Sequence, residues 1–531
     1  MFAGSFALES AEAVCVGEDL AGEDVLPVLA RLVDKSLVAT ETLAVSGSVR
    51  YRLLEILREY ALDRAHEAGE TDRLERGHRD FYLALAEQRP PEMLAPDHIA
   101  YLARELDNLR AALRRAIASR DMETGLRLGV ALWPLWYVRG LYTEGRAWLS
   151  DILALPAAAP LMGLRSRTLA WAGHLAFCQG DYTAAEQLLN QALDLARGLE
   201  DDQEVAVALQ LLGTPARGRG DLAYAEELYE QACAIDRRLA SRVWEAMTLG
   251  NLAMTAEDRA DHARAEVVAA EALALYAEQG HPWGVARMRE VLARVAVSRA
   301  DYAAAREQLE EAVEFQRELG DRQGLVMSLP TLARIALGLG EPDRAGDLLA
   351  EGLTLAYEAG ERLSVARALE AIATLLAEAR PERSMRLVGA AGALRQELGA
   401  RPTRAECDRL DSWQAAALRL LGGPTYAAAL AEGKQQPLGQ AVAEAAAVAQ
   451  AVVQSQYASA QPADELTARE REVARLLARG LSNRQIGEAL TIAEGTARIH
   501  AAHVLGKLGL HSRVQVAAWA RDHLLSAEAA D

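Results

Sequence analysis

Six short, similar segments, of which QGDYTAA is the second, decide the fold of this chain because they recur every forty residues. The segments are RGLYTEG, QGDYTAA, RGDLAYA, RADHARA, RADYAAA and LGEPDRA, which begin at Arg139, Gln179, Arg219, Arg259, Arg299 and Leu339. Apolar segments recur with the same period before the turns. These are LAWAG, LQLLG, LGNLA, LPTLA and LEAIA, starting at Leu169, Leu209, Leu249, Leu329 and Leu369. A fixed period of this length is typical of proteins built from stacked repeats.

Within each unit, small residues recur seven positions apart on what would be one face of a helix. They are Ala185, Ala225, Ala265, Ala305 and Ala345, and then Ala192, Ala232, Ala272, Ala312 and Gly352. Small side chains let a neighbouring helix approach closely. We therefore expect pairs of antiparallel helices joined by Gly-Asp-type turns and closed by glycines such as Gly280, Gly320 and Gly360.

This pattern resembles lengthened tetratricopeptide repeats over residues 125–400. Such arrays form a superhelix with a concave groove. The groove would take a protein, a peptide or a small molecule as ligand, although an array that serves only as a spacer remains an alternative.

Composition supports a mainly α fold for the 531 residues, because aromatic residues make up only 5% and strand-like alternation is rare. The four cysteines form no CxxC pair, which argues against a zinc or disulfide framework. The start has no basic signal region, and no apolar run is long enough to span a bilayer. We expect a cytoplasmic protein without a membrane partner.

Residues 1–66 indicate a helix, a hairpin with a turn at Ser46-Gly47-Ser48, and a second helix, which together suggest a winged helix. A helical subdomain that caps the array is the alternative. The segments LVDKSLV, RYRLLEILREYA, ELDNLRAALRRAI and LWPLWYVRG resemble the region that follows the ATPase module in large signal-transduction ATPases of the LuxR and AfsR (STAND) type. The resemblance makes residues 1–66 a remnant of that module and residues 67–124 a helical connector.

The phosphate-binding loop of those ATPases requires G-x-x-x-x-G-K-[ST], and this chain lacks it. Its Lys35-Ser36 pair follows Asp34 and is interpreted as structural. We therefore expect no enzyme activity, no catalytic residues and no cofactor. The chain is either a shortened regulator or the C-terminal fragment of such an ATPase.

A helical cap and linker over residues 401–463, ending in SQYASAQPAD, leads to a distinct block at residues 464–525. Thr467 and Glu470 predict a capping box for a first helix that stops at Gly480. Ser482 would cap a second helix, Thr496 to Leu508 would form a third, and Ser512 would start a fourth. On the third helix a core-facing stripe is expected at Ala497, Ala501, Val504, Leu505 and Leu508.

The order of this block resembles the LuxR-type helix-turn-helix pattern of L-T-x-R-E-x-E-V, G-x-S-N-x-x-I-A and T-V-K-x-H-x-x-x-I-x-x-K-L. The resemblance makes the third helix a recognition helix for the major groove. It implies that Arg498 is the basic groove residue, Ile499 an apolar groove contact, and Lys507 and Ser482 phosphate contacts. The remaining expected DNA-binding residues are Asn483, Arg484, Thr496, His500, Ala502, His503 and Arg513.

The block departs from the family pattern at Ala497, Gly487 and His503. Ala497 and Gly487 are smaller than the usual valine and alanine, so they reduce the apolar packing of the core. His500 and His503 have no third or fourth ligand nearby, so we expect no metal site.

The net charge of −19 is unevenly distributed. Residues 464–525 carry nine Lys or Arg against seven Asp or Glu, a net +2, which leaves −21 on the rest. An acidic body repels DNA, so phosphate contacts are left to the C-terminal block.

These patterns predict a bacterial transcription regulator that binds double-stranded DNA, with RNA polymerase as a further candidate partner. Val516, Ala520 and Leu524 form an apolar strip from which we expect a homodimer on DNA. A pure interaction scaffold is the alternative function.

Overall fold

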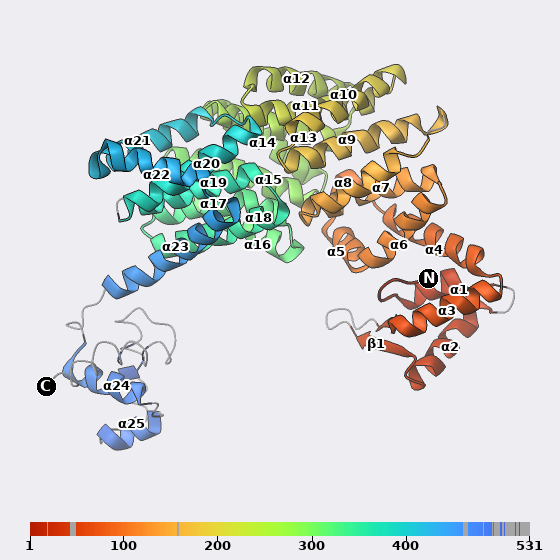
Figure 1. Ribbon diagram of the computed structural model, residues 1–531, viewed down its shortest axis with the longest axis horizontal. Coiled ribbons are helices and arrows are strands. Elements are labelled where there is room, and N and C mark those ends of the chain that lie inside the picture. Colours follow the sequence, from red (N-terminus) through yellow and green to blue (C-terminus); the bar gives the residue numbers. More distant parts are fainter. Residues whose placement is uncertain are drawn as a thin grey trace. The chain divides into compact units, whose positions relative to one another are not determined.

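The computed structural model describes residues 1–17, 20–42, 49–156, 159–377, 379–459, 466–479, 481, 483–490, 492, 497, 500, 501, 504, 516 and 520. The chain divides into two compact units, Met1–Gln450 and Ala451–Asp531. Helices make up nearly all of the regular structure, which confirms the mainly α fold (Figure 1). Within the described ranges no helix is both long and apolar enough to cross a membrane.

The first unit contains seven consecutive helix pairs. The first helices are α7 (Met122–Val138), α9 (Met162–Cys178), α11 (Asp202–Arg219), α13 (Arg242–Asp258), α15 (Pro282–Ser298), α17 (Arg322–Gly338) and α19 (Arg362–Leu376). The second helices are α8 (Tyr142–Leu153), α10 (Tyr182–Gly198), α12 (Leu222–Leu239), α14 (His262–Glu278), α16 (Tyr302–Leu319), α18 (Pro342–Ala359) and α20 (Pro381–Leu398). Successive first helices begin forty residues apart, which confirms the solenoid and its period.

The turns between the helices explain why each repeat keeps its length of forty residues. A residue in the left-handed region ends many of the helices, and an aspartate directly after it caps the next helix. In the turn before α10, Gly180 has φ +78°, and the carboxylate of Asp181 accepts the backbone N–H of Ala184 at 3.1 Å. The glycines expected to close the units, Gly280, Gly320 and Gly360, all have positive φ. Glycine adopts this conformation without the steric cost that a Cβ adds.

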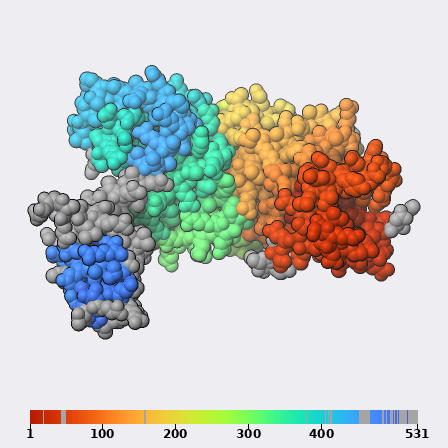
Figure 2. All heavy atoms as spheres, turned by 60° about the horizontal axis from the view of Figure 1, so that its bottom comes forward, coloured from red at the N-terminus to blue at the C-terminus, as the bar shows by residue number. Residues whose placement is uncertain are grey.

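The recurring small residues pack where successive helices meet. All ten lie in the second helices, and the nine alanines among them are almost fully buried. The residues are Ala185, Ala192, Ala225, Ala232, Ala265, Ala272, Ala305, Ala312, Ala345 and Gly352. The space-filling view shows atoms of successive repeats in contact along the array (Figure 2). Stacking of neighbours therefore supplies the core, as expected for a solenoid.

The first helices lie on the inside of the curved array, because they contact one another from pair to pair. The array winds far enough for α7 to contact α17. Tyr137 of α7 packs edge-on against Trp283 of α15, with ring centroids 6.0 Å apart. Part of the expected concave groove is therefore closed by contacts between distant pairs.

The N-terminal part of the first unit contains α1 (Leu8–Cys15), α2 (Gly22–Asp34), β1 (Val38–Thr42), β2 (Val49–Leu53), α3 (Glu55–Glu67), α4 (Thr71–Ala86), α5 (Pro96–Arg104) and α6 (Leu106–Ala118). Two short 3₁₀ turns lie at Pro91–Met93 and Ala159–Leu161. The strands pair antiparallel, with Val38 opposite Leu53. The order helix, hairpin, helix matches the expectation. The turn at residues 46–48 lies outside the described residues, and the winged-helix assignment stays a prediction.

After the array come α21 (Arg404–Leu421), α22 (Gly423–Gln435) and α23 (Leu438–Ser459). The expected linker SQYASAQPAD is wrong in its first half, because residues 455–459 continue α23. The alanine-rich run before them has high helix propensity, which carries the helix onward. The remainder of that segment lies outside the described residues.

Candidate functional site

The first helix that lies wholly within the C-terminal unit is capped as expected. In α24 (Ala468–Ala478), the Thr467 hydroxyl accepts the backbone N–H of Glu470 at 3.3 Å, and the Glu470 carboxylate accepts the backbone N–H of Thr467 at 2.8 Å. This reciprocal pair satisfies two N–H groups that the helix start leaves unbonded. The capping box is confirmed, and α25 (Asn483–Leu490) follows.

A small apolar core joins these two helices to residues further along the chain. Val473 and Leu477 of α24 and Ile486 of α25 are buried in the same cluster as Ala497 and Val504. Ala501 packs against the cluster. The stripe predicted for the third helix thus faces the core at Ala497, Ala501 and Val504, whereas Leu505 and Leu508 lie outside the described residues.

The apolar strip at Val516, Ala520 and Leu524 was expected to form a homodimer surface, and this expectation is wrong for Val516 and Ala520. Val516 and Ala520 are 0% exposed and belong to the core of the C-terminal unit itself. The unit is large enough to bury this strip because α24, α25 and the third-helix stripe converge on it. Leu524 lies outside the described residues.

Few of the expected DNA-binding residues can be located. His500 is helical and half-buried, and its Nδ1 has no hydrogen-bond partner among the described atoms. Asn483 and Arg484 open α25, although their side chains are not described. The others lie outside the described residues: Ser482, Thr496, Arg498, Ile499, Ala502, His503, Lys507 and Arg513. Their roles stay predictions.

Comparison with known families decides the nature of this unit. Residues 464–520 match the family described as "Bacterial regulatory proteins, luxR family". The C-terminal unit is therefore a LuxR-family domain. Residues 164–238 match the tetratricopeptide repeat family, so the LuxR-family domain follows a tetratricopeptide array.

Individual proteins resemble different parts of the chain. A Mycobacterium tuberculosis protein named "Putative HTH-type transcriptional regulator" is 36% identical over 227 residues, which are 40% of this chain and 25% of that protein. The nitrate/nitrite response regulator protein NarL of Escherichia coli is 45% identical over 56 residues, 10% of this chain and 26% of NarL. The chain thus spans about a quarter of the length of these relatives.

Among solved structures, the one described as "Crystal Structure of Rap Protein Complexed with Competence and Sporulation Factor" is 16% identical. The match covers 75% of this chain and 95% of that chain, with a TM-score of 0.45.

Sequence reasoning missed a buried polar seam between the first and last helix pairs. The Tyr142 hydroxyl donates to Oε1 of Glu361 at 2.6 Å, although the two residues are 219 positions apart. The Ser364 hydroxyl donates to Oε2 of the same carboxyl at 2.9 Å. Burial raises the pKa of Glu361 to about 7. The seam ties α8 to the start of α19 and helps to close the array on itself.

Burial also shifts the pKa values of two further side chains near the seam, Asp321 and His174. Burial raises the pKa of Asp321 to about 6, although its carboxylate accepts the Trp283 indole N–H at 2.8 Å. Burial lowers the pKa of His174 to about 4. Repeat spacing alone predicts contacts between neighbouring pairs, so it could not reveal contacts across several pairs. The only sequence signal is the concentration of Trp and Tyr in LWPLWYV, residues 132–138.

Proposed function

We propose that this protein is a transcription regulator that binds double-stranded DNA through its C-terminal LuxR-family domain. The match of residues 464–520 to the luxR family of bacterial regulatory proteins carries the proposal. The regulator names of the relatives and the capped, packed start of the domain support it. The charge distribution fits, because the acidic remainder of the chain would repel DNA.

Within the domain, we propose that residues 496–508 enter the major groove. Because Ala497, Ala501 and Val504 turn toward the core, the complementary positions Arg498, Ile499, Ala502 and His503 would face DNA. Arg498 can contact a guanine with two hydrogen bonds and would thereby read a base. Lys507 and Ser482 would contact phosphates, with Asn483, Arg484, Thr496, His500 and Arg513 at the edge of the interface.

The tetratricopeptide array would receive the regulatory signal. Its inner surface is built from seven first helices, and the array belongs to the part of the chain outside residues 464–525, which carries a net charge of −21 and would repel DNA. Binding as a homodimer, with RNA polymerase as a further partner, stays a prediction. It now requires a dimer surface other than Val516 and Ala520.

A footprint of the full chain across a bacterial genome tests the proposal. Immunoprecipitation of the tagged protein with its bound DNA is expected to recover discrete sites, and a variant lacking residues 464–531 is expected to recover none. A second variant lacking residues 125–400 is expected to keep the same sites but to lose any response to a signal. Recovery of identical sites without residues 464–531 would contradict the assignment of DNA binding to the LuxR-family domain.

A further inference from the structure

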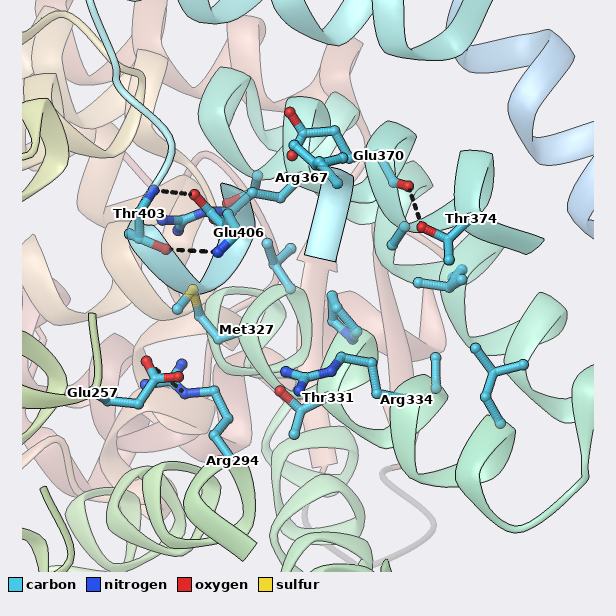
Figure 3. Close-up of a pocket in the computed structure, with 18 of the residues that line it drawn as sticks. Glu257, Arg294, Met327, Thr331, Arg334, Arg367, Glu370, Thr374, Thr403 and Glu406 are labelled. Atoms are coloured by element: carbon cyan, nitrogen blue, oxygen red, sulfur yellow. Dashed lines mark hydrogen bonds and ion pairs between the residues drawn. The ribbon is translucent and has the colours of Figure 1, made fainter. Parts of the chain in front are cut away.

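A cavity of about 420 Å³ opens among the later repeats of the array. Its lining comes mainly from the first helices α17 and α19, with further residues from α13, α15 and α21 (Figure 3). A volume of this size is typical of sites for small organic molecules. The cavity lies in the tetratricopeptide array and outside the LuxR-family domain.

The charged side chains at one wall of the cavity are paired with one another. Nε of Arg294 lies 3.5 Å from Glu257, and Nε of Arg217 lies 3.8 Å from Asp258. Burial raises the pKa of Asp258, while the guanidinium groups of Arg217 and Arg367 oppose this rise. Each carboxylate at this wall therefore already has a cation beside it.

The charges at the opposite wall are paired as well. Nε of Arg367 donates to Glu406 at 2.7 Å, and Figure 3 shows these two side chains together at one side of the cavity. Arg395, just behind the lining, donates to Glu370 at 2.7 Å. Arg334 also lines the cavity and is engaged in an interaction of its own. A charged ligand would lose its hydration without gaining an unpaired counter-charge, so the lining favours an uncharged ligand.

The rest of the lining is largely apolar. Met327, Pro330 and Leu337 of α17 contribute to it, and α21 adds Leu410 and the aromatic ring of Trp413. Burial of apolar surface drives the binding of small molecules in pockets of this kind. The body of the ligand is therefore expected to be apolar.

Two neutral polar groups of α17 are left for the ligand. The Thr331 hydroxyl makes no hydrogen bond with any described residue, although Thr331 lines the cavity and is only 4% exposed. Residue 330 is a proline within the helix, so the Val326 carbonyl lacks the N–H that would bond to it in a regular helix. Val326 also lines the cavity. The hydroxyl and the carbonyl lie within about one and a half helical turns of each other, so a single small ligand can reach both.

We propose that this cavity binds a small uncharged molecule that carries an amide group on an apolar body. The amide carbonyl accepts a hydrogen bond from the Thr331 hydroxyl, and the amide N–H donates to the Val326 carbonyl. The apolar body packs against Met327, Leu337 and Trp413. This inference deepens the sensor role proposed for the array, and it rests on that proposal for the regulatory consequence alone.

The test uses the full chain and three probes that share a phenylpropyl body: 3-phenylpropanamide, 3-phenylpropanoate and 3-phenylpropan-1-amine. Isothermal titration calorimetry is expected to show saturable binding of the neutral amide. The anion and the cation should each bind more weakly by roughly tenfold or more, because neither finds an unpaired partner. Binding of either ion as tight as that of the amide, or no binding of the amide at millimolar concentration, would overturn the proposal.

Variants locate the binding site. Thr331→Val removes the free hydroxyl at nearly constant shape, and it is expected to weaken binding of the amide by roughly threefold to tenfold, the range for one neutral hydrogen bond. Thr354→Val is the matched control, since its hydroxyl already donates to the Ala350 carbonyl at 2.8 Å and it lies outside the cavity lining. Ala371→Phe fills part of the cavity and is expected to abolish binding. Unchanged affinity in Thr331→Val or in Ala371→Phe would overturn the proposal.

Measurement of DNA binding by Thr331→Val keeps the two proposals apart. The variant is expected to retain wild-type affinity for DNA, because the substitution lies in the array. Weaker amide binding with DNA binding retained supports the cavity assignment. Amide binding by a chain that binds no DNA would contradict the proposed function while leaving the cavity assignment intact.

Discussion

Neutralising Glu361 should change how the stability of the array depends on pH. The carboxyl is 6% exposed and accepts hydrogen bonds from Tyr142 and Ser364. Burial raises its pKa from an ordinary value of 4.5 to about 7, so the folded chain holds this proton more tightly than the unfolded chain does. The stabilisation is therefore complete below pH 4.5 and is lost as pH rises through about 7.

The size of the effect follows from the same shift. Each pKa unit corresponds to about 1.4 kcal/mol. The contribution of Glu361 to the free energy of unfolding should therefore fall by about 2–3 kcal/mol as the pH rises from 5 to 8. Glu361→Gln removes the titration and keeps an oxygen that can accept from Tyr142. The variant should consequently be less sensitive to pH and more stable than the wild type at pH 8.

Urea unfolding followed by tryptophan fluorescence at pH 5 and pH 8 measures this difference. Burial also raises the pKa values of Asp236 and Asp321, so the wild type and the variant will both depend on pH. The informative quantity is therefore the difference between the pH dependence of the variant and that of the wild type. Glu358→Gln is the control, because its carboxylate pairs with Arg322 on the surface and is 55% exposed. Equal pH dependence in the wild type and Glu361→Gln would refute the reasoning.

Three further predictions concern packing and caps. Ala265→Leu should destabilise the array by about 1–3 kcal/mol, because Ala265 is fully buried against Ala256 and Val295; an unchanged melting curve would count against the assigned packing. Gly280→Ala should cost about 1 kcal/mol, because φ is +61° while no atom would touch the new Cβ; urea titration checks this, and a gain in stability would show that the turn relaxes. Thr467→Ala should cost the LuxR-family domain about 1 kcal/mol and increase hydrogen exchange in α24, through loss of the capping box; unchanged exchange would mean that the cap is dispensable.

The repeat array could be predicted from the sequence because its determinants are local. Gly-Asp turns and buried alanines repeat every forty residues, and each contact between neighbouring helices uses the same positions. The capping box at Thr467 and the stripe at Ala497 and Val504 were predictable for the same reason, since spacing along one helix fixes which side chains share a face.

Long-range packing could not be predicted in this way. The contact of Tyr142 with Glu361 depends on how far the superhelix winds over several pairs, and small angles between pairs accumulate without leaving a local signal. The burial of Val516 and Ala520 depends likewise on how four segments converge. An apolar strip on a single helix looks the same in sequence whether it faces a partner or its own core.

The central claim is that the LuxR-family domain reads DNA sequence through residues 496–508. The most direct measurement is fluorescence anisotropy with the full chain, at several salt concentrations, on an operator selected from the genomic footprint and on a scrambled version. Arg498→Ala is expected to cost about 1–3 kcal/mol on the operator and little on scrambled DNA, whereas Lys507→Ala should weaken both alike and reduce the salt dependence by about one ion. Equal losses on both DNAs for Arg498→Ala, or equal affinity of the wild type for both, would contradict the account.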